Sequence, residues 1–175
     1  LIQRGLLDII NAAKHLDEKS KLTFLISMPI FAEKASIDKF HALLDHHKVR
    51  KHFTLTSEIR NLALVLSAID AYVYPINMDE PSWAPVSALE ALSQGTPVIT
   101  TRIKIIEAFL KEDDALFYKP EHPKELAKTV QFLLGNKNEV KKRTAEAKKR
   151  VNKRFSREAV VKIVRDQLQH FNKEV

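Results

Sequence analysis

The 175-residue chain is predicted to form an α/β domain, with a doubly wound, Rossmann-like parallel sheet flanked by helices and two extra C-terminal helices. Three observations predict this fold. Short apolar runs typical of buried strands alternate with stretches of helical periodicity, and parallel strands need such helical crossovers. Apolar residues make up 45% of the sequence, which is enough for a packed core. The length suits one such domain and excludes two complete ones.

The elements alternate from the amino end. Residues 6–16 place Leu6, Ile9 and Leu16 on one helical face. The short apolar runs, each bounded by polar or turn-forming residues, predict strands at 22–27, 52–55, 71–74, 97–100 and 115–118. The amphipathic stretches between and after these runs predict helices at 33–46, 58–67, 86–94, 105–110, 123–134, 138–153 and 157–171.

The first helix has no strand before it, although a helix that packs on a parallel sheet normally follows one closely. We therefore expect residues 1–137 to form a Rossmann-like domain that lacks its first strand. Residues 138–175 are expected to be helices that pack on this same domain.

Several function classes are excluded by composition. The absence of cysteine excludes disulfides and thiolate zinc sites. The three glycines, Gly5, Gly95 and Gly135, permit neither a P-loop nor a G-x-G-x-x-G turn. No apolar stretch reaches the roughly 18 residues of a membrane span. The histidine cluster at residues 41–52 lacks the i, i+4 spacing of zinc ligands, so no metal site is expected.

The net charge of +7 is concentrated in one segment, Lys141 to Arg157, which holds nine basic residues and one acidic residue. Its apolar residues recur at helical spacing, so the basic residues occupy the other faces of a helix. Three interpretations stay open: a solvated helix face, a contact with an anionic membrane surface, and a nucleic-acid contact. The last is the least favoured, because no aromatic residues are interleaved for base stacking.

The connection between the strand at 71–74 and the helix at 86–94 is unusual. It carries three prolines, two acidic residues and the only tryptophan, Trp83. Glu90 then stands among small and apolar residues in the helix. Either its carboxylate faces water or pairs with a lysine, or it accepts hydrogen bonds from a polar ligand such as a ribose.

Two segments of this region, residues 70–75 and 85–99, resemble the donor-binding half of the group 1 (family 4-like) glycosyltransferases of the two-Rossmann GT-B type. The run Arg4-Gly5-Leu6-Leu7-Asp8 is similar to the start of that family's first helix, and Glu107 falls where its Pro-Glu helix start lies. The resemblance covers nearly the whole chain and implies a carboxy-terminal domain that binds a nucleotide-sugar.

The resemblance assigns roles by position. Glu90 matches the second glutamate of the family's E-x7-E motif and would bind the ribose, whereas the first position is Ser82. Glu80 would replace the missing carboxylate, given a two-residue insertion. Arg4 matches a lysine that neutralises the donor phosphates. The implied catalytic residues are Arg4 and Glu80, and the implied donor-binding residues are Ser82, Trp83, Val86, Ser87, Glu90 and Glu107.

The resemblance implies a retaining glycosyltransferase that moves a sugar to a glycan or lipid-linked acceptor, in polysaccharide biosynthesis, with no metal or other cofactor. The amino-terminal acceptor-binding domain is expected to be missing, so this chain would be a partial enzyme, inactive alone. We expect a cytoplasmic location, with peripheral contact to the inner membrane surface through Lys141 to Arg157. The alternative is a non-catalytic Rossmann-like scaffold that has lost the donor site.

Overall fold

The computed structural model describes residues 5–16, 21–27, 34–57, 59–77 and 84–171. Its strands are β1 (Phe24–Ser27), β2 (Phe53–Thr56), β3 (Tyr72–Tyr74), β4 (Val98–Thr101) and β5 (Leu116–Tyr118). Its α-helices are α1 (Leu6–Ala13), α2 (Lys34–His46), α3 (Leu62–Ala68), α4 (Val86–Gln94), α5 (Lys104–Phe109), α6 (Pro123–Gly135), α7 (Lys137–Arg154) and α8 (Arg157–Phe171). A short 3-10 helix, η2 (Arg50–His52), leads into β2. The predicted α/β class is confirmed.

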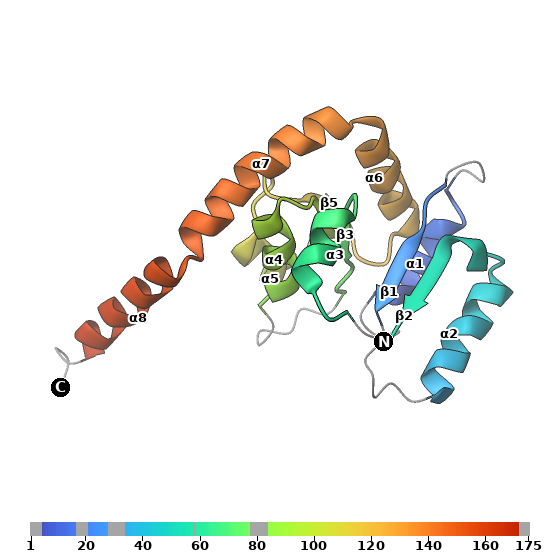
Figure 1. Ribbon diagram of the computed structural model, residues 1–175, viewed down its shortest axis with the longest axis horizontal. Helices are drawn as coiled ribbons and strands as arrows, with labels where there is room; N and C mark the ends of the chain where they lie inside the picture. The colour runs from blue at the N-terminus through green and yellow to red at the C-terminus, as the bar shows by residue number, and fades with distance from the viewer. Residues whose placement is uncertain (1–4, 17–20, 28–33, 58, 78–83, 172–175) are drawn as a thin grey trace.

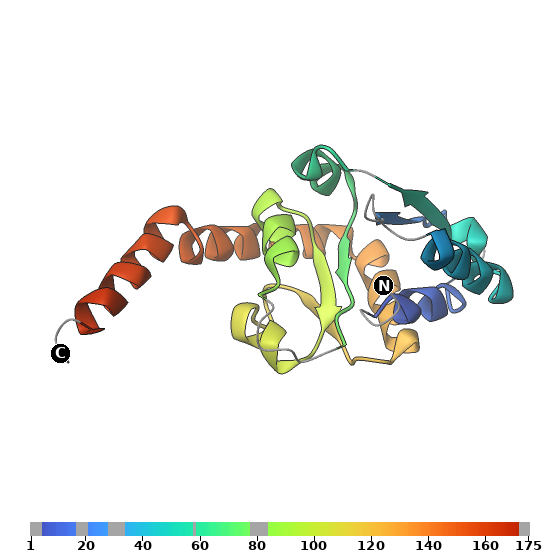
Figure 2. The ribbon, with the colours of Figure 1, turned by 90° about the horizontal axis from the view of Figure 1, so that it is seen from below.

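All strand pairs are parallel, and the strands form two separate sheets (Figures 1 and 2). β1 pairs with β2, and β4 lies between β3 and β5. Within the described ranges no hydrogen-bond ladder joins β1 to β3, so these five strands do not form one continuous sheet. The two sheets are instead held together by apolar packing, since Phe24 of β1 belongs to the same buried cluster as Ile99 of β4 and Leu116 of β5.

Two hydrophobic cores result. The amino-terminal core joins buried residues of α1, β1, α2 and α6. The carboxy-terminal core joins α3, α4, β4 and α5 with the buried side of α7. Figure 1 shows α7 running along the body and α8 extending beyond it.

Capping chemistry sets two helix ends that bear on the site. α3 begins at Leu62 and not at residue 58 as expected, because the Asn61 side chain accepts a hydrogen bond from the Leu64 amide at 3.0 Å and caps the helix there. α4 ends as predicted at Gln94, where Gly95 adopts a left-handed conformation with φ of 88°.

α8 leaves much of its apolar face uncovered. Val160, Val164 and Leu168 are between 45% and 61% exposed and line a surface depression with Val161 and Arg165. Among the helices that the structure describes, none is both long enough and apolar enough to cross a lipid bilayer.

Candidate functional site

The end of β3 is fixed by threonines of the neighbouring strand. The Thr100 hydroxyl donates a hydrogen bond to the Tyr74 carbonyl at 2.9 Å. The Thr101 hydroxyl donates to the Ile76 carbonyl, two residues further on. β4 therefore positions not only β3 but also the first residues of the connection that leads to α4.

The start of α1 lies against this same connection. A Cβ atom added at Gly5 would lie only 1.5 Å from the Pro75 carbonyl oxygen, and Gly5 has φ of 77°. Both the close approach and the left-handed backbone require glycine here. Arg4 precedes Gly5 directly, so the sequence positions this predicted phosphate-binding residue next to a chain segment that touches the end of β3.

Ser87, in the first turn of α4, joins the helix to the sheet. The Tyr72 hydroxyl donates a hydrogen bond to the Ser87 Oγ at 3.0 Å. Burial raises the pKa of the Tyr72 hydroxyl, the bond to Ser87 opposes this rise, and the nearby negative charge of Glu90 adds to it. The Ser87 side chain thus has a structural partner in β3, which the sequence reasoning did not identify.

Glu90 lines an open hollow of about 450 Å³ between α4 and the junction of α7 with α8. The other lining residues are Val86, Leu89 and Ser93 of α4 and Val151, Asn152, Phe155 and Ser156 of the junction. Val86, Glu90 and Ser93 have the i, i+4, i+7 spacing of one helical face. The Glu90 carboxylate is exposed, and within the described part of the chain it forms no ion pair or hydrogen bond. The structure therefore shows Glu90 exposed to solvent, and no lysine among the described residues pairs with it.

The first turn of α4 also presents free backbone donors. The Val86 amide is used within the chain, since it donates to the Ala84 carbonyl at 2.8 Å. The amides of Ser87 and Ala88 have no partner among the described residues. Because Pro85 provides no side-chain cap, this helix end retains N–H groups that can donate hydrogen bonds to an anion.

Asn77, three residues beyond β3, is a site residue that sequence reasoning missed. Its side-chain oxygen Oδ1 is buried and has no hydrogen-bond partner among the described residues. A buried acceptor without a donor costs free energy unless a ligand or water satisfies it. No sequence signal distinguishes this asparagine from an ordinary turn residue.

Glu107 lies in the first turn of α5 and is not among the residues that line the hollow. Its carboxylate is 3.4 Å from Arg102, which also forms two hydrogen bonds with Glu112 at 2.8 and 3.1 Å. The Glu112 carboxylate raises the pKa of Arg102 and has its own pKa lowered in return. The structure therefore gives Glu107 a partner on its own helix end and does not bring it to Glu90.

The remaining predicted site residues, Arg4, Glu80, Ser82 and Trp83, lie outside the described residues. Of the eight predicted residues, the structure thus brings Val86 and Glu90 to one hollow and joins Ser87 to β3. Within the described ranges, no three histidine, aspartate or glutamate side chains are grouped so that they could hold a metal ion.

The fold is similar to that of solved glycosyltransferases. HepE from Anabaena, solved in complex with UDP-glucose, superposes with a TM-score of 0.81 at 15% identity, over 100% of this chain and 46% of HepE. Sucrose-phosphate synthase from Thermosynechococcus elongatus gives a TM-score of 0.81 at 21% identity, over 100% of this chain and 44% of the synthase. The C-terminal domain of the LpcC glycosyl transferase from Francisella tularensis gives 0.70 at 16% identity, over 89% of this chain and 80% of that domain.

These likenesses show the fold, and the chain spans less than half the length of HepE and of the synthase. Comparison of the sequence with curated proteins returned no match. The family model described as "Glycosyl transferases group 1" matches residues 2–150, which is most of the chain. This match includes β3, α4 and Glu90, and the chain belongs to the group 1 glycosyl transferases.

Proposed function

We propose that this chain is the donor-binding domain of a retaining glycosyltransferase, with a nucleotide-sugar bound where β3 leads into α4. The observation that carries the proposal is the exposed Glu90 carboxylate, which has no partner among the described residues and faces a hollow at the side of α4. A carboxylate in this state can accept hydrogen bonds from both hydroxyls of a ribose. The complex of HepE with UDP-glucose supports the ligand class by analogy.

The diphosphate of the donor would lie at the first turn of α4. The free amide of Ser87 can donate to a phosphate oxygen, and the partial positive charge of the helix end favours an anion. Arg4 would add a cation, because Gly5 holds this part of the chain against Pro75. The orphaned Asn77 oxygen supports a polar ligand near the same connection.

In the proposed reaction the bond between the anomeric carbon and the phosphate oxygen breaks, and a hydroxyl of a glycan or lipid-linked acceptor forms the new bond with retained configuration. The departing nucleoside diphosphate keeps the bonding electrons, and its charge is stabilised by Arg4 and the Ser87 amide without a metal. Glu80 would lie near the sugar, and Ser82 and Trp83 would complete the proposed donor site. Glu107 is left out of this proposal because it pairs with Arg102 and does not line the hollow. The acceptor hydroxyl gives its proton to the departing phosphate oxygen as the new bond forms.

An acceptor-binding domain would have to complete the active site, so we propose that this chain alone is inactive. We also retain the proposal that a strand preceding α1 completes the sheet. It is supported by the two sheets, β1-β2 and β3-β4-β5, which share a core but are not joined by a hydrogen-bond ladder among the described residues. A cytoplasmic role in polysaccharide biosynthesis is proposed from the family resemblance and the cysteine-free sequence.

Isothermal titration calorimetry of the chain with UDP, GDP and ADP tests the donor site. We expect one nucleotide to bind and Glu90→Ala to weaken it by about 10- to 100-fold, the value of hydrogen bonds to a charged group. Glu139→Ala removes an exposed carboxylate of α7 outside the hollow and should leave binding unchanged. EDTA should also have no effect. If a folded chain binds none of the three nucleotides, the non-catalytic scaffold becomes the better interpretation.

A further inference from the structure

The net positive charge of the chain is concentrated in α7 and α8, and the structure separates the arginines of α7 from most of its lysines. Residues 137–169 contain twelve basic and four acidic residues, a net charge of +8, so the rest of the chain carries a net charge of −1. One side of α7 is buried against the carboxy-terminal core through Ala147 and Val151 and continues into the amino-terminal core through Val140. The charged residues occupy the remaining sides.

The arginines beside the buried side of α7 are used to hold the fold. Arg143 donates to the Ala115 carbonyl at 2.7 Å, and Arg150 donates to the Asp113 carbonyl at 2.8 Å and to the Asp114 carboxylate at 2.7 Å. Arg154 donates to the carbonyls of Ala108 and Phe109, at the end of α5, at 3.0 and 2.9 Å. These three guanidinium groups satisfy backbone carbonyls, and their donors are directed at the chain itself.

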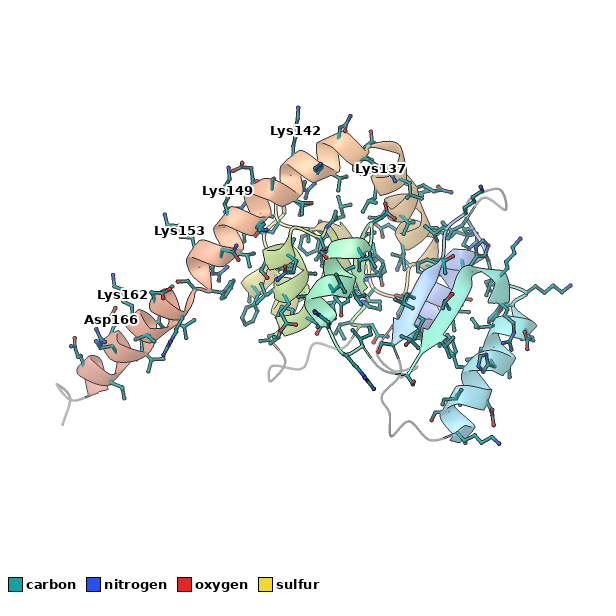
Figure 3. The ribbon with its side chains drawn as sticks, viewed as in Figure 1. Lys137, Lys142, Lys149, Lys153, Lys162 and Asp166 are labelled. Carbon is teal, nitrogen blue, oxygen red and sulfur yellow. The ribbon has the colours of Figure 1, made fainter. Side chains whose placement is uncertain are left out.

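Four lysines define what we call the lysine ridge: Lys142, Lys149 and Lys153 of α7 and Lys162 of α8. Figure 3 shows them projecting from the outer side of the two helices, away from the sheets. Lys142, Lys153 and Lys162 have no ion pair or hydrogen bond within the described ranges, and Lys149 pairs only with the exposed Glu146 at 2.8 Å. The ridge is therefore a row of hydrated ammonium groups that stabilise nothing in the described chain.

We propose that the lysine ridge docks on an anionic membrane surface. The ammonium group is a compact point charge on a flexible stem, and such groups are attracted to the headgroups of anionic lipids without needing a shaped site. A row of them on the outer side of two successive helices can face a negatively charged surface together. Four acidic residues, Glu139, Glu146, Glu158 and Asp166, lie within one helical turn of the ridge lysines, but residues 137–169 as a whole keep a net charge of +8.

A nucleic acid fits the same surface less well. Recognition of nucleic acid relies on arginine forks and on aromatic rings for stacking, and here the arginines of α7 are occupied by the fold. The aromatic residue closest in sequence to the ridge, Phe155, stacks on Phe109 with ring centroids 6.1 Å apart, and Arg154 covers it at 4.9 Å. It is not available to a base.

Docking through the ridge would leave the candidate site open. The hollow beside Glu90 is lined by Val151, which is two residues from both Lys149 and Lys153. Two residues correspond to about 200° around a helix, so Val151 lies on the side of α7 opposite to these two lysines. The Val160, Val164 and Leu168 face of α8 does not contain Lys162, and the proposed attraction is therefore electrostatic and not apolar.

Vesicle co-sedimentation tests this proposal on the 175-residue chain, independently of nucleotide binding. We expect binding to vesicles of phosphatidylcholine with phosphatidylglycerol, none to phosphatidylcholine alone, and release by high salt. The triple variant K142Q/K153Q/K162Q should bind about 100-fold more weakly, at about fivefold per lysine. The matched control K34Q/K39Q/K128Q removes three exposed lysines of α2 and α6 with the same change of net charge and should bind as the unchanged chain does.

Circular dichroism would confirm that both variants fold. The proposal is overturned if the unchanged chain ignores anionic vesicles at low salt, or if both triple variants lose affinity equally, because net charge alone would then explain the attraction. Tighter binding of a DNA duplex than of the anionic vesicles under the same conditions would overturn it in favour of nucleic acid. None of these outcomes depends on whether Glu90 binds a ribose.

Discussion

Each of the two cores has one buried aspartate, and the two cores accommodate it differently. Asp8, in α1 at the amino-terminal core, accepts from the Tyr118 hydroxyl at 3.3 Å and the Glu121 amide at 3.0 Å, both neutral donors. Asp114, beside the carboxy-terminal core, accepts from the Lys111 amide and from the Arg150 guanidinium. Burial raises the pKa of Asp8 above its ordinary value, against the hydrogen bonds that lower it.

This difference explains the charge pattern of α7. The carboxy-terminal core uses arginines of α7 to neutralise Asp114 and to satisfy carbonyls near α5, whereas Asp8 in the amino-terminal core accepts hydrogen bonds from neutral donors. One part of the positive charge is therefore structural, and this part includes Lys137, which pairs with Asp70, and Lys148, which donates to the Gln94 carbonyl. The lysines of the ridge are left for a role outside the fold. Counting basic residues along the sequence cannot separate these two groups.

The largest expected effect on stability comes from adding a third buried carboxylate, beside Asp8 and Asp114, at a position without a polar partner. Ala147 is fully buried between α7 and α4, so Ala147→Asp should destabilise the chain by about 3 kcal/mol or more, which urea unfolding would measure. Val164→Asp places the same group on the exposed face of α8 and should change stability by less than about 0.5 kcal/mol. Equal effects would mean that α8 is covered in solution.

The next effect sharpens the distinction between arginines and lysines. Arg150→Gln removes the cation from Asp114 and should cost about 1 to 2 kcal/mol, a value reduced because Arg150 is itself half exposed. Lys153→Gln, three residues along the same helix, should cost less than about 0.5 kcal/mol. Thermal unfolding of both variants checks this. A larger loss for Lys153→Gln would show that the ridge has a structural role.

The pH dependence of stability tests the environment of Asp8. Because the pKa of Asp8 is raised in the fold, its favourable contribution is complete below the unfolded value of 3.8 and is lost as pH rises through the folded value. Asp8→Asn stays neutral, so its stability relative to the unchanged chain should increase with pH above about 3.8. Denaturant unfolding at about pH 3 to pH 7, the range in which carboxyl groups titrate, measures this difference. A difference that does not vary with pH would contradict the cause given for the shift.

The smallest effect concerns the hydroxyl that joins the sheet to the candidate site. Tyr72→Phe removes the bond to Ser87 and should cost about 0.5 to 1.5 kcal/mol of stability. Calorimetry of the same variant should show nucleotide affinity close to that of the unchanged chain, because Glu90 and the Ser87 amide are kept. A loss of affinity as large as that of Glu90→Ala would assign Tyr72 to the binding site itself.

Much of the fold was predictable from apolar periodicity. Each predicted strand appears within one or two residues of its expected bounds, and α4 ends at Gly95, where the sequence has a glycine able to adopt positive φ. The start of α3 was predicted four residues too early, because the apolar pattern does not reveal that Asn61 caps the helix. The division into two sheets was not predicted either, since periodicity identifies strands but not their hydrogen-bond neighbours.

The candidate site was predictable only in part. Glu90 and Val86 were identified by their sequence context, and the structure joins them at one hollow. Asn77, the Tyr72 partner of Ser87, and the approach of Gly5 to Pro75 depend on which segments lie side by side. The predicted contribution of Glu107 is not supported by proximity, because its nearest cation, Arg102, lies on its own side of α5.

The sequence by itself determined the α/β alternation, the position of the unusual connection before α4, and the concentration of charge in α7, because these are properties of neighbouring residues. Only the tertiary structure decided which basic groups hold the fold and which face outward, and that the Glu90 carboxylate has no internal partner among the described residues. The physical reason is that a charged side chain is assigned by the groups that surround it, and these come from elements distant in the sequence.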